Sequence, residues 1–264
     1  MKRNKNIHFL KMDFYRAVCS RRFTIGIIGI PIMMQLASIE TFRWRLSVLN
    51  TFWLVVYSLP FLLTLIFCAF IYADSLCEDF EYKFIYAEII RGNLCRYAMS
   101  KTITIFLTSV VAMALGMVLF AITLRLQVPW ISLSESTYQV AITEGGFREI
   151  LESEHYLAYF GLFGVQFGLL AGVLSLLAAY VSLYISNKLL VLSVPVVAYY
   201  LLVYFENGIS GSPYLNIGCI FDASNNLWRN DAFSFLYAVA IAVVFGLILS
   251  FLIYRRLNRR IRNE

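Results

Sequence analysis

The chain has 264 residues, of which 60% are hydrophobic and 14% are charged, whereas soluble domains contain roughly 45–50% apolar and about 25% charged residues. This composition argues against a soluble globular domain, because a chain of this length cannot hide so much apolar surface from water. The net charge of +6 follows from the membrane topology described below, so no nucleic-acid partner is predicted.

Apolar residues occur in six blocks that approach or exceed the length needed to cross a bilayer as a helix, about 20 residues. A helix satisfies its own backbone polar groups, as hydrocarbon requires. The predicted spans are 23–39, 52–73, 102–124, 157–185, 189–205 and 232–254. The sequence therefore predicts an all-α integral membrane protein, with residues 1–264 forming a single transmembrane domain.

The segment before the first span, residues 1–22, has an amphipathic pattern. Ile7, Leu10 and Phe14 recur at helical spacing, while Lys11 and Arg16 provide a basic side. Such a pattern is typical of a helix that lies in the membrane interface, with its cations near anionic headgroups. We expect an N-terminal interfacial helix here, and the alternative is a frayed basic tail.

The loop after the second span, residues 74–101, is long and polar, but it does not resemble a disordered linker. It contains no proline and one glycine, Gly92, while Phe80, Phe84 and Ala87 recur on one face of a possible helix. The spacing predicts a helix over about 79–90 that ends at Gly92.

Two further loops are predicted on the opposite side of the membrane. The first, 127–156, is acidic, and the second, 206–231, is rich in Gly, Asn and Ser and carries aromatic residues suited to a membrane interface. Neither is long enough to form an ectodomain with a substantial core.

Orientation follows from the basic residues, which are retained preferentially on the cytoplasmic side. Most of the 22 Lys and Arg residues lie before the first span, in loop 74–101, at Lys188 and after residue 254. Both termini and loop 74–101 are therefore predicted in the cytoplasm, and loops 127–156 and 206–231 outside. The five scattered cysteines do not suggest a disulfide framework.

Small and polar residues within the spans predict helix contacts. The fourth span carries Gly161, Gly164, Gly168 and Gly172 on nearly one face, which would let another helix backbone approach closely. Packing within the chain and contact with a second copy both remain open, with internal packing favoured. Gln35 and Gln166 are the main polar side chains at depth and are possible pathway residues. Gln166 could line a pathway or bond a neighbouring helix, with the helix bond favoured.

Catalytic and metal-binding motifs are missing from the sequence. The two histidines, His8 and His155, fall on opposite sides of the predicted membrane, so no histidine metal site is expected. The chain has no G-x-S-x-G elbow and no G-x-x-x-x-G-K-[ST] phosphate loop. We therefore expect no enzyme activity and no cofactor in this chain; if ATP drives it, ATP and Mg²⁺ bind a separate subunit.

The arrangement resembles the permease subunits of type-2 ATP-binding-cassette (ABC) exporters, which have six spans and an amphipathic helix before the first. The loop after the second span carries the similarity, in the order Glu81-Tyr82, the stretch 83–90, Arg91-Gly92, Arg96 and Ser100-Lys101. One departure is that Lys83-Phe84 stands where this family often has Gly-Thr, and the stretch after Gly92 is about one residue short.

The resemblance implies an assembly of two permease chains, identical or different, with two ATPase chains. The helix after the second span would dock on the ATPase as a coupling helix, with Phe80 and Phe84 as apolar anchors. The residues expected to pair at the rim are Glu78, Asp79, Glu81, Arg91 and Arg96. In the alternative interpretation these charges form a solvated face.

The predicted function is thus a membrane subunit of an ATP-driven exporter in a bacterial plasma membrane. The apolar interior suggests an amphipathic or hydrophobic substrate such as a peptide, a lipid or a drug. The alternative is a stand-alone channel or a structural or regulatory helical bundle without an ATPase partner.

Overall fold

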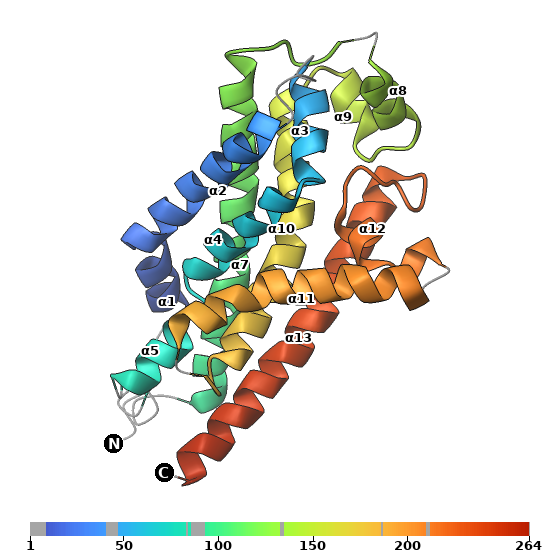
Figure 1. The fold of residues 1–264 in the computed structure, drawn as a ribbon. Coiled ribbons are helices and arrows are strands. Elements are labelled where there is room, and N and C mark those ends of the chain that lie inside the picture. Colours follow the sequence, from blue (N-terminus) through green and yellow to red (C-terminus); the bar gives the residue numbers. More distant parts are fainter. Residues whose placement is uncertain are drawn as a thin grey trace.

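A computed structural model describes residues 9–40, 47–82, 84–85, 93–132, 135–185, 187–209 and 212–263. Throughout these ranges the chain forms helices and no strand, which confirms the predicted all-α class. In chain order the helices are α1 (Phe9–Val18), α2 (Arg21–Glu40), α3 (Val48–Val56), η2 (Leu59–Leu63), α4 (Thr64–Phe70), α5 (Ser75–Glu81), α7 (Leu94–Arg125), α8 (Ser136–Thr143), α9 (Arg148–Glu152), α10 (Tyr156–Val181), α11 (Lys188–Ile209), η3 (Pro213–Leu215), α12 (Ile217–Phe221) and α13 (Asp231–Asn263) (Figure 1).

Within the described ranges four helices, α2, α7, α10 and α13, are long and apolar enough to cross a membrane. They correspond to the first, third, fourth and sixth predicted spans. The second predicted span, 52–73, is broken: α3 and the η2–α4 segment meet at an angle of 72°, and together they could make a fifth span. Pro60 lies at the start of η2, where it cannot continue the hydrogen-bond ladder of α3.

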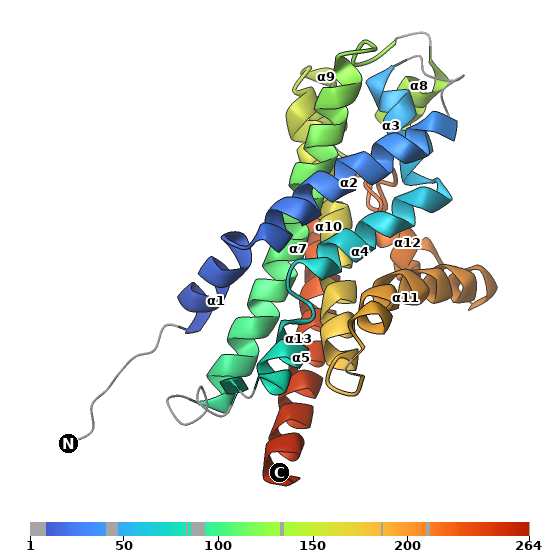
Figure 2. The same cartoon turned by 60° about the vertical axis from the view of Figure 1, so that its left-hand side comes forward.

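The fifth predicted span, 189–205, falls in α11 (Lys188–Ile209), in which side chains are described as far as Val203; the described apolar stretch, Lys188–Val203, is by itself shorter than the four candidate spans. Figures 1 and 2 show α11 lying across the long helices instead of running beside them. The described residues therefore provide four candidate spans, or five if the bent pair is one span, and the prediction of six spans is not confirmed.

The helices α7 and α10 form the centre of the bundle, and α2, α4, α11 and α13 pack around them. Burial differs sharply between the helices. In the apolar stretch of α10, 78% of the residues are buried inside the bundle, against 22% in the apolar stretch of α13. Because α13 is strongly apolar and yet exposed, its outer face is suited to contact with lipid or another apolar surface.

The seam between α7 and α10 is formed by the predicted glycine face. A Cβ on Gly164 would lie 2.8 Å from the Ala114 Cα, and one on Gly168 would lie 3.0 Å from the Val110 carbonyl oxygen. At Gly172 the nearest atom is on the Phe106 ring, at 2.7 Å, whereas at Gly161 it is 3.6 Å away. The glycines thus allow close approach of two helices within the chain.

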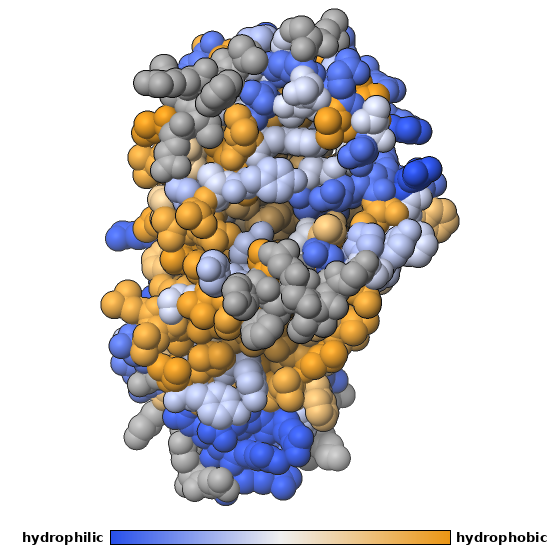
Figure 3. Space-filling view, turned by 45° about the vertical axis from the view of Figure 1, so that its right-hand side comes forward, coloured by the Kyte–Doolittle hydropathy of each residue, from blue (hydrophilic) through white to orange (hydrophobic). Residues whose placement is uncertain are grey.

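Polar residues gather at the two ends of the molecule. We call the end that holds α1, α5 and the last turns of α13 the terminal end, and the end that holds α8 and α9 the distal end. In Figure 3 hydrophobic side chains cover the middle of the visible face, and hydrophilic ones cover the terminal end below it. This distribution fits a multi-pass membrane protein.

Candidate functional site

A buried ion cluster lies at the terminal end, centred on Lys101. The Lys101 ammonium is 2.8 Å from an Asp79 carboxylate oxygen and 3.2 Å from one of Asp13, and it donates to the Tyr72 hydroxyl at 3.0 Å. The side chains of Lys101, Asp13 and Asp79 are almost completely inaccessible to solvent. Burial of these charges is tolerated because each has an opposite partner and further hydrogen bonds.

Two further donors, both from α7, complete the cluster. The Tyr97 hydroxyl donates to Asp79 at 2.6 Å, and the Ser100 hydroxyl donates to Asp13. The Asn93 side chain caps α7 by accepting from the Cys95 backbone N–H, and Tyr97 and Lys101 then lie one turn apart on the same face. The cluster therefore joins α1, α5 and the first turns of α7.

A second, more exposed ion cluster joins α5 to α2 and α11. Arg22 contacts Glu78 at 2.7 Å and Asp74 at 3.1 Å, and Lys188 contacts Glu78 at 3.0 Å. Burial opposes ionisation of Glu78, but hydrogen bonds from Arg22 and Lys188 outweigh it and hold the pKa of that carboxyl below its ordinary value. Burial raises the pKa of Asp74 despite the charge of Arg22.

The predicted coupling residues fall into three groups. Glu78 and Asp79 pair within the chain, as described above, and Phe80 is half-buried, with the Arg260 guanidinium carbon 4.3 Å from its ring centroid. Glu81, Phe84 and Arg96 are exposed. Arg91 lies outside the described residues, as does most of the second half of the predicted helix over 79–90.

The helix α5 begins earlier than predicted and ends at Glu81, before the turn at Tyr82. Two aromatic rings, Tyr82 and Phe84, follow directly after this end, with centroids 6.2 Å apart, and we call this segment the exposed tip of α5. Both side chains are more than half exposed. An exposed aromatic pair on a helix tip outside the apolar bundle is a candidate contact for another protein.

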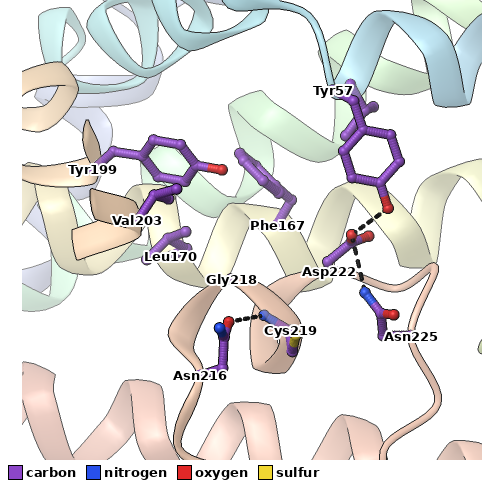
Figure 4. Close-up of a pocket in the computed structure, with 11 residues that line it drawn as sticks. Tyr57, Phe167, Leu170, Tyr199, Val203, Asn216, Gly218, Cys219, Asp222 and Asn225 are labelled. Carbon is purple, nitrogen blue, oxygen red and sulfur yellow. Dashed lines mark hydrogen bonds between the residues drawn. The ribbon is translucent and has the colours of Figure 1, made fainter. Parts of the chain in front are cut away.

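A cavity of about 280 Å³ lies on the other side of the bundle, between the end of α3, the middle of α10, α11 and α12. Figure 4 shows Tyr57, Asp222 and Asn225 at one end, and Phe167, Leu170, Tyr199 and Val203 at the other. The cavity is therefore amphipathic, with one polar end and one apolar end.

Asp222 is the charged residue of this polar end. The Tyr57 hydroxyl donates to its Oδ2 atom at 2.6 Å, the Asn225 amide donates to the same atom at 3.2 Å, and the Ser224 backbone N–H donates to Oδ1 at 2.9 Å. Asp222 is 8% exposed. All three donors are neutral, so the hydrogen bonds orient the carboxylate but do not neutralise it.

The helix α12, which forms one wall, lies within the predicted outer loop 206–231 but packs into the bundle. Ile220 and Phe221 are buried, and the Gln166 side chain of α10 donates to the Ile220 carbonyl at 3.0 Å. Gln166 is about 15 Å along the helix axis from Tyr156, the first residue of α10. This loop therefore returns to the middle of the bundle instead of staying outside it.

The two predicted pathway glutamines differ in their surroundings. Gln166 donates a hydrogen bond to the backbone of α12, so it bonds a neighbouring helix, which is the role favoured from the sequence. Gln35 is half-buried in α2, and its buried side-chain oxygen has no hydrogen-bond partner.

Within the ranges that the structure describes, no group of three or more His, Cys, Asp or Glu residues could hold a metal ion. Comparison with family models, with curated proteins and with solved structures gives no match for this chain. Function must therefore be argued from the two regions described above.

The residues that define these regions were not all singled out from the sequence. Asp13, Lys101, Tyr57 and Asp222 were missed as site residues. Asp13 carries one usable signal, because it follows Phe9 by one helical turn and precedes Ala17 by another, on the buried face of α1. A carboxylate on an apolar helix face indicates a buried partner.

Proposed function

We propose that the chain is the membrane permease subunit of an ATP-driven ABC exporter and acts with a separate ATPase subunit. It would move an amphipathic or hydrophobic molecule outward across a bacterial plasma membrane. Its terminal end would face the cytoplasm, because the basic residues concentrate there.

The observation that supports this proposal most is the set of bonds made by α5. Asp79 joins this short helix to Arg16 of α1 and to α7. Glu78 joins it to α2 and α11, and Phe80 joins it to α13. A displacement of α5 would therefore be transmitted to the ends of most of the long helices.

The exposed tip of α5 provides a place where a partner could apply that displacement. Tyr82 and Phe84 extend beyond the paired residues and remain open to a binding surface. Buried aromatic side chains commonly dominate the binding energy of protein interfaces. In this arrangement Phe84 serves as the anchor, while Asp79 and Glu78 connect α5 to the bundle instead of pairing with the ATPase.

A second permease chain would complete the assembly, and the apolar outer face of α13 would contact membrane lipid or that second chain. Lipid contact and helix contact both suit an exposed apolar face, since neither leaves polar groups unpaired. The bundle would thus act with its partners as one unit across the bilayer.

Co-purification tests the proposal. The tagged chain, extracted in mild detergent from its native host, is expected to bring down a stoichiometric protein that carries a Walker phosphate-binding motif. Phe84→Asp should reduce recovery of that protein about tenfold or more, because a charge replaces an apolar anchor. The matched control is Leu126→Asp, which places the same charge on an exposed apolar residue just after α7, at the distal end.

Recovery of the intact chain without any nucleotide-binding protein would refute the exporter assignment. A stand-alone channel or a structural bundle would then be the better description. If an ATPase is recovered equally with wild type, Phe84→Asp and Leu126→Asp, the role of Phe84 as the anchor is refuted.

A further inference from the structure

The cavity between α3, α10, α11 and α12 combines a charge with an apolar chamber. Figure 4 shows the Tyr57 hydroxyl directed at Asp222 at one end, and the Phe167 and Tyr199 rings with the Leu170 side chain at the other. A molecule that fills both ends needs a polar head and an apolar body. We infer that this cavity binds a monovalent organic cation with an apolar body, its cationic head against Asp222.

The charge of the cavity requires a positive partner. Buried carboxylates are normally paired with a cation, because removal of a charge from water is costly. Asp222 is nearly buried and receives bonds from Tyr57, Asn225 and Ser224, but among the ion pairs of the described residues none involves it. A bound cation would supply the missing charge.

The aromatic lining favours an organic cation over a metal ion. Phe167 and Tyr199 both line the cavity, with their ring centroids 6.3 Å apart, so two aromatic rings form much of the apolar end. Rings attract organic cations through their quadrupoles and also bury apolar groups. A hard metal ion instead needs several oxygen ligands, and among the described residues that line this cavity Asp222 is the one carboxylate.

The size of the cavity sets an upper limit on the ligand. Its volume of about 280 Å³ is close to the lower end of small-molecule pockets, roughly 300–1,000 Å³. The cavity therefore suits a compact cation with one aromatic ring or a short alkyl chain, and it is too small for a peptide or a whole phospholipid.

The position of the cavity links it to a break in the helices. Tyr57 directly follows α3, at the 72° bend before η2, and α12 returns into the bundle on the opposite wall. Non-helical backbone at membrane depth is tolerated where it is buried in protein or lines a cavity. Opening or closing of this bend would change the distance between the Tyr57 hydroxyl and Asp222.

Binding can be measured without any partner protein, so this inference fails or succeeds separately from the exporter proposal. The purified chain is placed in nanodiscs of neutral phosphatidylcholine, and binding of radiolabelled benzyltrimethylammonium is measured. Neopentylbenzene, which has the same shape with carbon in place of the charged nitrogen, is the competitor. We expect saturable binding of the cation and at least about tenfold weaker competition by the neutral compound.

Two variants test the two ends of the cavity. Asp222→Asn keeps the size and accepting oxygen of the side chain but removes its charge, so the affinity should fall at least about tenfold. Val203→Phe should also weaken binding, because the larger ring fills the apolar end while Asp222 is unchanged. The matched control, Glu152→Gln, removes one negative charge from an exposed residue of α9 and should leave binding unchanged.

The inference is overturned if Asp222→Asn binds the cation as well as wild type does, or if neopentylbenzene competes equally well. It is also overturned if the cation does not bind wild type at all. If Asp222→Asn fails to fold, judged by its elution and thermal unfolding, Val203→Phe and the neutral competitor decide the outcome. If the exporter takes up its substrate through this cavity, the substrate would be an organic cation. That extension rests on the proposed function.

Discussion

Buried carboxylates at the terminal end and in the cavity have different partners. At the terminal end, Asp13 and Asp79 share the ammonium of Lys101, with hydroxyl groups around all three. In the cavity, Asp222 has hydroxyl and amide donors but no cationic partner among the described residues. The first arrangement is complete within the chain, while the second is complete only with a bound cation.

This difference separates structural charges from binding charges. A complete buried ion cluster holds helices in one arrangement, because any separation would expose a charge without its partner. An oriented carboxylate without a cation, at the edge of a cavity, is instead prepared for a ligand. Polar residues in a membrane protein can therefore be interpreted only after their partners inside the chain are known.

The largest expected effect comes from removing the cation of the complete cluster. Lys101→Met removes the one buried cation of this cluster and leaves Asp13 and Asp79 with the half-exposed Arg16, 3.8 Å from Asp79, as the remaining ion-pair partner among the described residues. This loss should cost about 3–5 kcal/mol in the free energy of unfolding. Unfolding in mixed micelles with a rising fraction of sodium dodecyl sulfate measures this difference.

Two further variants show whether the loss is due to charge. Adding Asp13→Asn and Asp79→Asn to Lys101→Met should recover most of the stability, because no buried charge then remains. Lys188→Met removes a lysine whose side chain is 41% exposed and should cost less than about 1 kcal/mol. If Lys101→Met and Lys188→Met cost the same, the terminal cluster is not a structural charge cluster.

The α7–α10 seam connects the two regions, and its glycines offer a matched pair of variants. Gly164→Ala places a Cβ 2.8 Å from the Ala114 backbone, so the helices must separate, whereas Gly161→Ala meets nothing nearer than 3.6 Å. We expect Gly164→Ala to destabilise the bundle by about 1–3 kcal/mol. Gly161→Ala should be neutral or stabilise it by up to about 1 kcal/mol, since alanine favours helix.

The same micelle unfolding measurement compares the two glycine variants. Equal effects would mean that α7 and α10 are not in backbone contact at Gly164. If Gly164→Ala also weakens cation binding while Gly161→Ala does not, the seam would control the shape of the cavity as well as the stability of the bundle.

The long helices could be predicted from the sequence because length and hydropathy depend only on local residues. The spans near α2, α7, α10 and α13 were located in this way. The bend between α3 and η2 could not be placed, although Pro60 marks it, because a bilayer tolerates proline when neighbouring groups satisfy the freed backbone. That condition depends on packing, which a single sequence does not show.

The sites were harder to predict than the spans. Asp79 was expected to face a partner protein, but Lys101 and Tyr97 bind it within the chain. Charged loop residues have many possible partners, and their spacing does not distinguish an internal one from an external one. Asp222 lies in a segment whose Gly, Asn and Ser content suggested an outer loop, and only the apolar pair Ile220 and Phe221 indicated burial.

The comparison can be sharpened by giving Asp222 an internal cation. Asn225 is exposed and donates to Asp222 at 3.2 Å, so Asn225→Lys would place an ammonium beside the carboxylate. We expect benzyltrimethylammonium to bind about tenfold more weakly, or ~1.4 kcal/mol, with little change in thermal stability. Asn225→Gln is the control, because it keeps an amide and adds no charge. Unchanged binding in Asn225→Lys would show that the cation does not sit at Asp222.

The smallest expected effect concerns the exposed cluster around Glu78. Glu78→Gln removes the charge that Arg22 and Lys188 share, which should cost ~0.2–1 kcal/mol near neutral pH because these cations are partly exposed. The pKa of Glu78 is lowered in the folded chain, so its contribution is complete above the ordinary glutamate pKa of about 4.3. As the pH falls through the lowered pKa, the contribution is lost, and the unfolding free energies of wild type and Glu78→Gln should converge. The control is Glu81→Gln, at the exposed end of the same helix. Its free energy of unfolding should differ little from that of wild type, both near neutral pH and in acid, so no convergence is expected. A difference for Glu78→Gln that persists in acid would mean that its amide disturbs packing, and the second cluster would then not be held by charge.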